Sequence, residues 1–368
     1  MLRALIPVVV GILLTVPAQA RQQRRDPLPP GYEEALATYR GGSVLGALGL
    51  LSTVSDSKLV DAAELVWRGT GVPPELRMGR IRTAVAMHSE LVFRRAPARR
   101  VFTQDPSLTV ARLLVRRLAR AADEASDGAG AAERRFARDW YLLVASFWHG
   151  RGEVGWSRAY LDEARDLFSS DPQVLLVSGA DREMLSHLTA GFLRQFRTNG
   201  EAVRDTEINP AKELEEAEKL LRQAAARAPG LVEARLRLGR VLYRRGDLAG
   251  ATRELRAVLE QTVHERGRYE PMRYLAWLFL GVIEVDRGDL AAARRCYTEA
   301  LSLFPEGQAA LLALSEASYL DGRGAEAASE IVSLLRLRRK EDPWWGYLLG
   351  DWWHFEARLT MLRAEGMR

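Results

Sequence analysis

The chain has 368 residues, of which 47% are hydrophobic and 27% are charged, a composition typical of a folded soluble protein. This length accommodates about two domains or one extended repeat array. The formal net charge of +5 is small beside 53 basic and 48 acidic residues, so charge alone gives no reason to expect a nucleic-acid partner.

Residues 1–20 read MLRALIPVVVGILLTVPAQA and have the features of a secretory signal peptide. Arg3 gives a basic start, an apolar run follows, and the segment ends in the small-x-small pattern AQA that a signal peptidase cuts. The apolar run is shorter than the ~20 residues that a membrane-spanning helix requires. We therefore expect an exported protein, periplasmic or secreted, that is cleaved after Ala20, with an uncleaved anchor as the alternative. Residues 21–40 are expected to form an extended polar linker.

Residues 41–200 show apolar side chains at helical spacing, and strand-like alternation is nearly absent there. Clear stripes lie within 59–66, 110–118 and 136–147. We expect divergent helical hairpins in this part of the chain, with a separate helical domain as the alternative.

Residues 201–337 contain internal repetition. Segments 232–259, 274–305 and 308–335 fall into register when each is aligned on one small residue. A leucine comes just before that residue, a glycine follows seven positions later, an alanine twelve later and a bulky residue sixteen later. The three sets are Leu238, Gly239, Gly246, Ala251 and Leu255; Leu280, Gly281, Gly288, Ala293 and Tyr297; and Leu314, Ser315, Gly322, Ala327 and Ile331.

This spacing predicts pairs of closely packed helices. The small residue and the alanine let two helices approach each other, and the bulky residue fills the gap to the next pair. The glycine permits the left-handed backbone that ends the first helix. Because no single unit can bury its apolar face alone, several units must stack.

The pattern resembles the tetratricopeptide repeat. The second unit carries the family's signature at Trp277, Leu280, Gly281, Ala293, Tyr297, Ala300 and Pro305, and a further half-unit supplies Ala217, Leu221, Ala224 and Pro229. Residues 133–172 hold a more degenerate unit. The resemblance implies an all-α, right-handed superhelical solenoid of antiparallel helix pairs.

The resemblance also implies that a protein or peptide partner binds in a concave groove lined by the first helix of each pair. The groove-facing positions, counted from the small residues, are Leu236, Arg240, Tyr243, Leu278, Val282, Val285, Leu312, Glu316 and Tyr319. Tyrosine and arginine suit protein recognition, and packing against neighbouring units is the alternative. The family's clamp for a C-terminal carboxylate uses lysine and asparagine, whereas Leu236 and Arg240 stand at those places here. This departure argues against capture of a chaperone tail.

Residues 338–368 are rich in tryptophan and are expected to form a C-terminal capping helix. In DPWWGYLLGDWWHFEARL, Trp345 and Trp352 lie on an apolar stripe that would cover the last repeat. Trp344 and Trp353 fall at or outside the edges of this stripe, so we expect them to contact a partner. A ligand box is the alternative. Charged residues disfavour membrane insertion, although peripheral attachment stays open.

Motifs for catalysis, cofactors or metals are missing from the sequence. The five histidines lack the spacing of a zinc site, and the single cysteine, Cys296, excludes an intramolecular disulfide and a cysteine metal cluster. Arginine clusters at 94–100 and 112–120 are interpreted as a hydrated surface, with an acidic or phosphate-bearing partner as the alternative. We expect no cofactor, no metal and no nucleic acid.

These observations together predict an exported, noncatalytic scaffold or adaptor of the cell envelope. The alternatives are an enzyme or solute-binding protein with a site in residues 41–200, and an assembly factor for an envelope complex. Two carboxylates or histidines close together in one pocket would favour the enzyme, and an open aromatic-lined groove would favour the scaffold.

Overall fold

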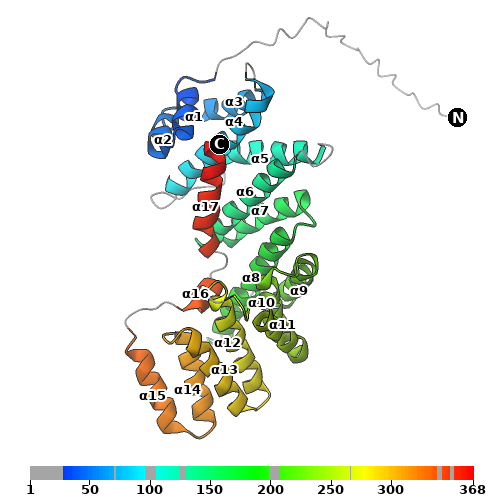
Figure 1. Ribbon diagram of the computed structural model, residues 1–368, viewed down its shortest axis with the longest axis vertical. Helices are drawn as coiled ribbons and strands as arrows, with labels where there is room; N and C mark the ends of the chain where they lie inside the picture. The colour runs from blue at the N-terminus through cyan, green and yellow to red at the C-terminus, as the bar shows by residue number, and fades with distance from the viewer. Residues whose placement is uncertain are drawn as a thin grey trace, which may run out of the picture.

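The computed structural model describes residues 28–69, 72–95, 105–124, 130–198, 208–265, 267–337, 342–348 and 352–368. Over these residues the regular secondary structure is entirely α-helical, and Figure 1 labels the helices α1 to α17 in chain order. The all-α prediction is therefore confirmed for the described part of the chain. The segment predicted as a signal peptide, residues 1–20, lies outside it.

The first seven helices share one apolar core. They are α1 (Tyr32–Arg40), α2 (Val44–Leu51), α3 (Asp56–Arg68), α4 (Pro74–Arg95), α5 (Pro106–Glu124), α6 (Ala131–His149) and α7 (Val154–Leu167). Helix α1 lies within residues 21–40, so the prediction of an extended linker is wrong from Tyr32 onward. The reason is that Tyr32 and Tyr39 stand two helical turns apart on one face, and both are fully buried.

The next eight helices form consecutive antiparallel pairs with a second apolar core (Figure 1). The pairs are α8 (Pro172–Thr198) with α9 (Pro210–Arg227), α10 (Val232–Arg244) with α11 (Leu248–Gln261), α12 (Glu270–Asp286) with α13 (Leu290–Leu303), and α14 (Gln308–Leu320) with α15 (Gly324–Leu335). Each helix packs against the next one in sequence. The predicted solenoid of helix pairs is therefore confirmed.

The small residues of the repeats stand where the two helices of a pair meet. A Cβ atom added at Gly281 would lie 2.3 Å from Tyr297 Cε1, and one added at Gly239 would lie 2.8 Å from Leu255 Cγ. In the last pair, the Ser315 hydroxyl of α14 donates to the carbonyl of Ala327 in α15 at 2.9 Å. The register read from the sequence thus identifies the residues that face each other across each pair.

The turn inside each of the last three pairs follows from one glycine. Gly246, Gly288 and Gly322 have φ values of 88°, 80° and 77°, a left-handed backbone that costs other residues more than glycine. In two of these three pairs, the second helix then begins with a capped first turn. Asp247 accepts from the amide of Gly250, and Asp289 does the same for Ala292.

Helix α8 is the partner of the half-unit at α9, and the sequence register did not reveal it. Gly179 plays the part of the small residue, because a Cβ atom there would lie 2.7 Å from Leu221 Cγ. The spacing from Gly179 to Leu221 is far longer than from Gly281 to Tyr297, since α8 is extended to Thr198 and residues 199–207 follow before α9 begins. A search for a fixed spacing therefore missed this pair.

The C-terminal residues form α16 (Pro343–Leu348) and α17 (Trp352–Met367), and they do not cap the last repeat. Figure 1 shows α17, in red, returning along the molecule to lie against α4 and α6. Phe355, Leu359 and Leu362 are buried in the N-terminal core. Glu90 of α4, which is 1% exposed, pairs with Arg363 of α17. The predicted capping role is therefore wrong, because the apolar face of α17 and its buried ion pair match the N-terminal helices.

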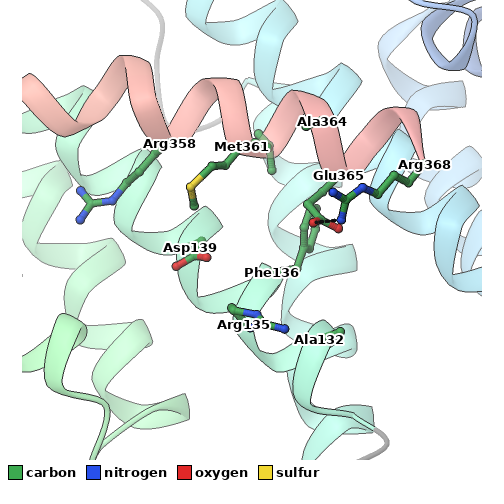
Figure 2. A pocket seen from close by; sticks show the side chains of 10 residues that line it. Ala132, Arg135, Phe136, Asp139, Arg358, Met361, Ala364, Glu365 and Arg368 are labelled. Atoms are coloured by element: carbon green, nitrogen blue, oxygen red, sulfur yellow. Dashed lines mark hydrogen bonds and ion pairs between the residues drawn. The ribbon is translucent and has the colours of Figure 1, made fainter. Parts of the chain in front are cut away.

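Between α17 and α6 lies a cavity of about 410 Å³, lined in part by Arg135, Asp139, Arg358 and Glu365. Figure 2 shows these charged side chains below α17, with Arg368 donating to Glu365 on the same helix. Among the helices described, none combines the length and the hydropathy that crossing a bilayer requires.

Candidate functional site

The inner face of the repeat array, made by α8, α10, α12 and α14, is covered in part by residues 342–348, which include α16. Each of the four helices contributes a contact to this segment: Glu183 from α8, Arg240 from α10, Phe279 from α12 and Ala309 from α14. The surface that the sequence predicts to receive a partner is thus partly filled by the chain itself.

The carboxylate of Asp342 fixes one end of this segment. It accepts from the Tyr274 hydroxyl at 3.0 Å and from the backbone amide of Ala309 at 2.7 Å. Its other oxygen accepts from the amide of Trp344 at 2.7 Å, which caps α16. Burial, and then the charge of Asp342, raises the pKa of Tyr274. The Tyr274 hydroxyl therefore stays protonated and serves as a donor.

Three aromatic rings hold the middle of the segment. Trp344 and Tyr347 of α16 stack on each other with an angle of 8° between their planes. Phe279 of α12 meets both rings edge-on, with its centroid 5.9 Å from that of Trp344 and 5.4 Å from that of Tyr347. Such edge-to-face contacts are favourable beyond the area they bury.

A buried ionic network lies beneath these rings. The carboxylate of Glu183, which is 1% exposed, accepts from Arg240 at 2.9 Å, from Arg237 at 3.4 Å and from the Tyr347 hydroxyl at 2.6 Å. The Arg240 guanidinium carbon lies 4.6 Å from the centroid of the Trp344 ring, and that of Arg237 lies 4.5 Å from the Tyr347 ring. Both arginines thus make cation–π contacts with α16.

The surroundings shift the pKa values of Tyr347 and Arg237. Burial raises the pKa of Tyr347, and the Glu183 carboxylate raises it further, so the phenol donates to Glu183 at every physiological pH. Burial opposes the charge on Arg237, but Glu233, Tyr347 and Glu183 outweigh it and raise the pKa of that guanidinium. Tyr347 therefore stays a hydrogen-bond donor, and Arg237 stays charged.

Six of the predicted partner-binding residues are either clearly inaccessible or clearly exposed. Leu236 and Leu278 are buried in the repeat core, and Arg240 is covered by Glu183 and Trp344, so these three are inaccessible in this arrangement. Leu312, Glu316 and Tyr319, all on α14, are exposed. The inaccessible residues pack within the array, as the alternative interpretation expected. The exposed residues are accessible, and partner binding by them stays a prediction.

The remaining predicted positions are intermediate or lie outside the described side chains. Tyr243, Val282 and Val285 are half-buried, and burial together with Asp286 raises the pKa of Tyr243 to about 12. Trp344 is half-buried against the chain's own helices, whereas Trp345, predicted to be core, is exposed. The side chains of Trp352 and Trp353 lie outside those that the structure describes.

An open cavity adjoins the filled part of the inner face. It has a volume of about 540 Å³ and is lined by Ala309 and Leu312 of α14, Leu335 of α15, and Trp344 and Trp345 of α16, among others. Leu335 is 78% exposed and Tyr319 is 72% exposed. Exposed apolar side chains that gather in this way are typical of protein-binding surfaces.

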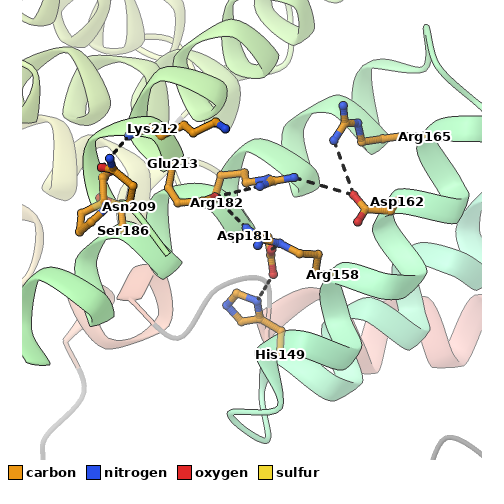
Figure 3. A network of polar contacts seen from close by, with 11 residues as sticks. His149, Arg158, Asp162, Arg165, Asp181, Arg182, Ser186, Asn209, Lys212 and Glu213 are labelled. Atoms are coloured by element: carbon orange, nitrogen blue, oxygen red, sulfur yellow. Dashed lines mark hydrogen bonds and ion pairs between the residues drawn. The ribbon is translucent and has the colours of Figure 1, made fainter. Parts of the chain in front are cut away.

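A separate polar network joins α6, α7, α8 and α9 (Figure 3). His149 Nδ1 lies 3.4 Å from Asp181 Oδ1. Glu213 of α9 accepts from Arg158 at 2.7 Å and from Arg182 at 3.0 Å. The network connects the first helices of the array to the N-terminal core, which gives these charged groups a structural role.

Residues 41–200 contribute one further cavity with several acidic groups. It has a volume of about 400 Å³ and is lined by Asp162 and Asp166, with Arg165, Glu216 and Lys219 among its other residues. Two carboxylates in one cavity are the feature that would favour the enzyme alternative, but Asp162 pairs with Arg165 and Arg182. Neither histidine nor cysteine lines the cavity. Among the described residues, no group of three or more His, Cys, Asp or Glu side chains is placed to hold a metal ion.

Three of the arginines of α5 also have partners. Arg112 and Arg116 pair with Glu163, and Arg117 pairs with Glu64. These pairs agree with the interpretation of this cluster as part of an ordinary charged surface. The other cluster extends to residues 96–100, which lie outside the described part of the chain.

The residues around α16 were partly detectable in the sequence. Arg237 and Phe279 each stand two positions before a small residue, Gly239 and Gly281, so the repeat register places them at equivalent points of α10 and α12. The groove positions implied by the family resemblance did not include this position, two residues before the small residue. Glu183 was missed because it lies on α8, whose register is hidden by its long connection to α9.

Comparison with known proteins gives matches to the repeat family. Two sequence profiles described as tetratricopeptide repeat match residues 211–270 and 280–342. Among solved structures, that of PilF from Pseudomonas aeruginosa has 15% identity and a TM-score of 0.42, covering 61% of this chain and 88% of its own. The structure of MamA residues 41 to the end from Desulfovibrio magneticus has 18% identity and a TM-score of 0.39, covering 56% and 97%. No curated protein sequence is significantly similar to this chain.

Proposed function

We propose that this chain, whose residues 211–270 and 280–342 match tetratricopeptide repeat profiles, is a noncatalytic scaffold that binds a protein or peptide on its repeat array. Stacked helix pairs of this kind present extended surfaces for recognition. The partner is held at the open end of the inner face, where α14, α15 and α16 meet.

The observation that carries this proposal is the exposed apolar surface of the last pair. Leu312 and Tyr319 of α14 and Leu335 of α15 are all exposed. Leu312 and Leu335 also line the cavity of about 540 Å³. A terminal repeat normally needs a polar outer face or a covering element. Helix α17, which was expected to cover this pair, lies instead on α4 and α6. A partner's apolar side chains would cover this surface.

The test is affinity capture from native envelopes with a variant of this surface. Leu312→Asp with Tyr319→Ala changes two exposed side chains, so the fold should be retained. We expect the enrichment of the partner to fall at least about tenfold, because loss of one central aromatic contact costs about 2 kcal/mol. Leu45→Asp, at an exposed position on α2, is the matched control and should leave the enrichment unchanged. Equal enrichment by both variants would contradict the proposal.

We also propose that the protein works in the cell envelope, as a scaffold, adaptor or assembly factor there. The support is the signal-like order of charge, apolar run and AQA site in residues 1–20. Intact-mass analysis of the protein from its native host should give a chain that begins at Arg21. A full-length chain found in the cytoplasmic fraction would contradict this location.

A further inference from the structure

Residues 342–348 contact the array as a bound peptide would. The segment has one buried carboxylate, Asp342, and two aromatic side chains, Trp344 and Tyr347, that face the inner surface. Trp345, on the same short helix, is 49% exposed. The contacts are therefore concentrated on an acidic residue and on the aromatic residues two and five positions after it.

The array supplies a separate partner for each of these groups. Tyr274 and the amide of Ala309 donate to the carboxylate, a charge-assisted arrangement that is stronger than a neutral hydrogen bond. The Arg240 guanidinium lies over the Trp344 ring, and Phe279 meets both rings at their edges. Glu183 accepts from the Tyr347 hydroxyl.

The recognising groups are fixed by contacts that do not involve α16. Arg237 is held by Glu233 at 2.8 Å as well as by Glu183. The Tyr274 hydroxyl also accepts from the amide of Ala310 at 3.2 Å, and its ring meets Phe304. The receiving surface is thus organised by the array itself, which lowers the cost of binding a ligand there.

We propose that residues 342–348 are an internal ligand of the array, and that the partner carries a segment of the same chemistry that replaces it. That segment has an aspartate or glutamate followed by aromatic residues two and five positions later. The inference rests on the proposed scaffold function and adds to it the class of partner and a means of regulation. Displacement of the internal ligand opens a continuous surface from Glu183 to Leu312.

Intramolecular competition sets the expected size of the effect. A tethered segment acts at an effective concentration of roughly millimolar. A free peptide whose intrinsic dissociation constant is roughly 10–100 μM would therefore bind the intact protein about ten- to a hundredfold more weakly than a protein whose internal ligand has been weakened.

The experiment uses a fluorescein-labelled peptide with the sequence DPWWGYL and measures its binding by fluorescence anisotropy. The receptors are the full chain and its Trp344→Ala, Tyr347→Ala double variant, with circular dichroism as a check of folding. We expect at least tenfold tighter binding to the double variant. If that variant fails to fold, Trp344→Ala alone serves in its place, because Trp344 is only half-buried.

Two controls test whether the peptide occupies the intended surface. A peptide DPAWGAL, without the two aromatic side chains, should not bind the double variant. Phe279→Ala added to the double variant should weaken binding of DPWWGYL at least tenfold. Equal affinity of DPWWGYL for the intact and double-variant proteins, or no binding to either, would overturn the inference.

These outcomes are distinct from those of the capture experiment. Loss of capture in Leu312→Asp, Tyr319→Ala tests the exposed surface of α14 and needs no displacement of α16. Intact capture together with absent peptide binding would overturn the internal-ligand inference alone. If no protein is captured by any variant but the peptide binds tightly to the double variant, the proposed binding site at α14 is contradicted. The internal-ligand inference is then retained.

Discussion

The imidazole of His88 is fully buried in α4, with the Tyr32 hydroxyl 2.8 Å from its Nε2 atom. Burial lowers the pKa of His88 from 6.5 to about 3. The unfolded chain therefore binds a proton between these two pH values that the folded chain excludes. The stabilisation from this residue is complete above pH 6.5 and is lost as the pH falls below 6.5 toward 3.

The pH dependence of stability provides a test at this residue. In urea unfolding between pH 6.5 and 5, the intact chain should lose up to about 1.4 kcal/mol per pH unit through His88. His88→Gln cannot gain a proton, and its amide can still bond to Tyr32. The free energy of unfolding of the variant should therefore lack the pH dependence that His88 contributes. Identical slopes for the two proteins would contradict the account of His88.

Glu183 is the residue on which the centre of the inner face depends. Removing its charge leaves Arg237 and Arg240 without their shared buried carboxylate. We expect Glu183→Gln to lower the free energy of unfolding by roughly 3–5 kcal/mol, the usual cost of breaking a buried pair. Glu326→Gln changes a side chain that is 49% exposed and pairs with the partly exposed Arg294, so it should cost less than about 1 kcal/mol. Chemical denaturation of both variants measures the difference, and similar costs would count against a central role for Glu183.

At the scale of elements, the close contact within each pair depends on the small residue of the register. A methyl group at Gly281 would overlap the Tyr297 ring, whereas nothing lies within 4 Å of a Cβ atom at Gly155 in α7. Gly281→Ala should therefore destabilise the protein by about 1–3 kcal/mol through overpacking. Gly155→Ala should stabilise it by up to about 1 kcal/mol through helix propensity. Thermal unfolding of the two variants tests this, and a stabilising Gly281→Ala would refute the register.

The register could be predicted from the sequence because all the repeats have the same local geometry. Gly239 with Leu255 and Gly281 with Tyr297 are pairs at a fixed spacing within one helical hairpin. The groove positions were less well predicted. Leu278 is buried in the core of the array. Arg240 pairs with Glu183 of α8, so its exposure depends on a residue far away in the sequence.

At the scale of the whole molecule, the C-terminal residues connect its two cores. Residues 342–348 lie on the inner face of the array, and α17 then joins the N-terminal helices through Phe355 and through Arg363 with Glu90. The sequence showed an apolar stripe that needed covering but not which surface would cover it. Proximity in the chain favoured the last repeat, whereas the buried carboxylate of Glu90 and the rings of Phe93 and Phe147 decide the position of α17.

Seating of residues 342–348 on the inner face is the central claim, and amide hydrogen exchange tests it most directly. The first amides of a helix lack partners within the helix, and those of Ala309 and Ala310 in α14 donate to Asp342 and Tyr274 instead. Their exchange, followed by NMR, should be at least about tenfold slower in the intact chain than in Asp342→Ala. The amide of Ala292, at a matching position in α13, should exchange equally in both proteins. Equally fast exchange of Ala309 and Ala310 in the two proteins would contradict the claim.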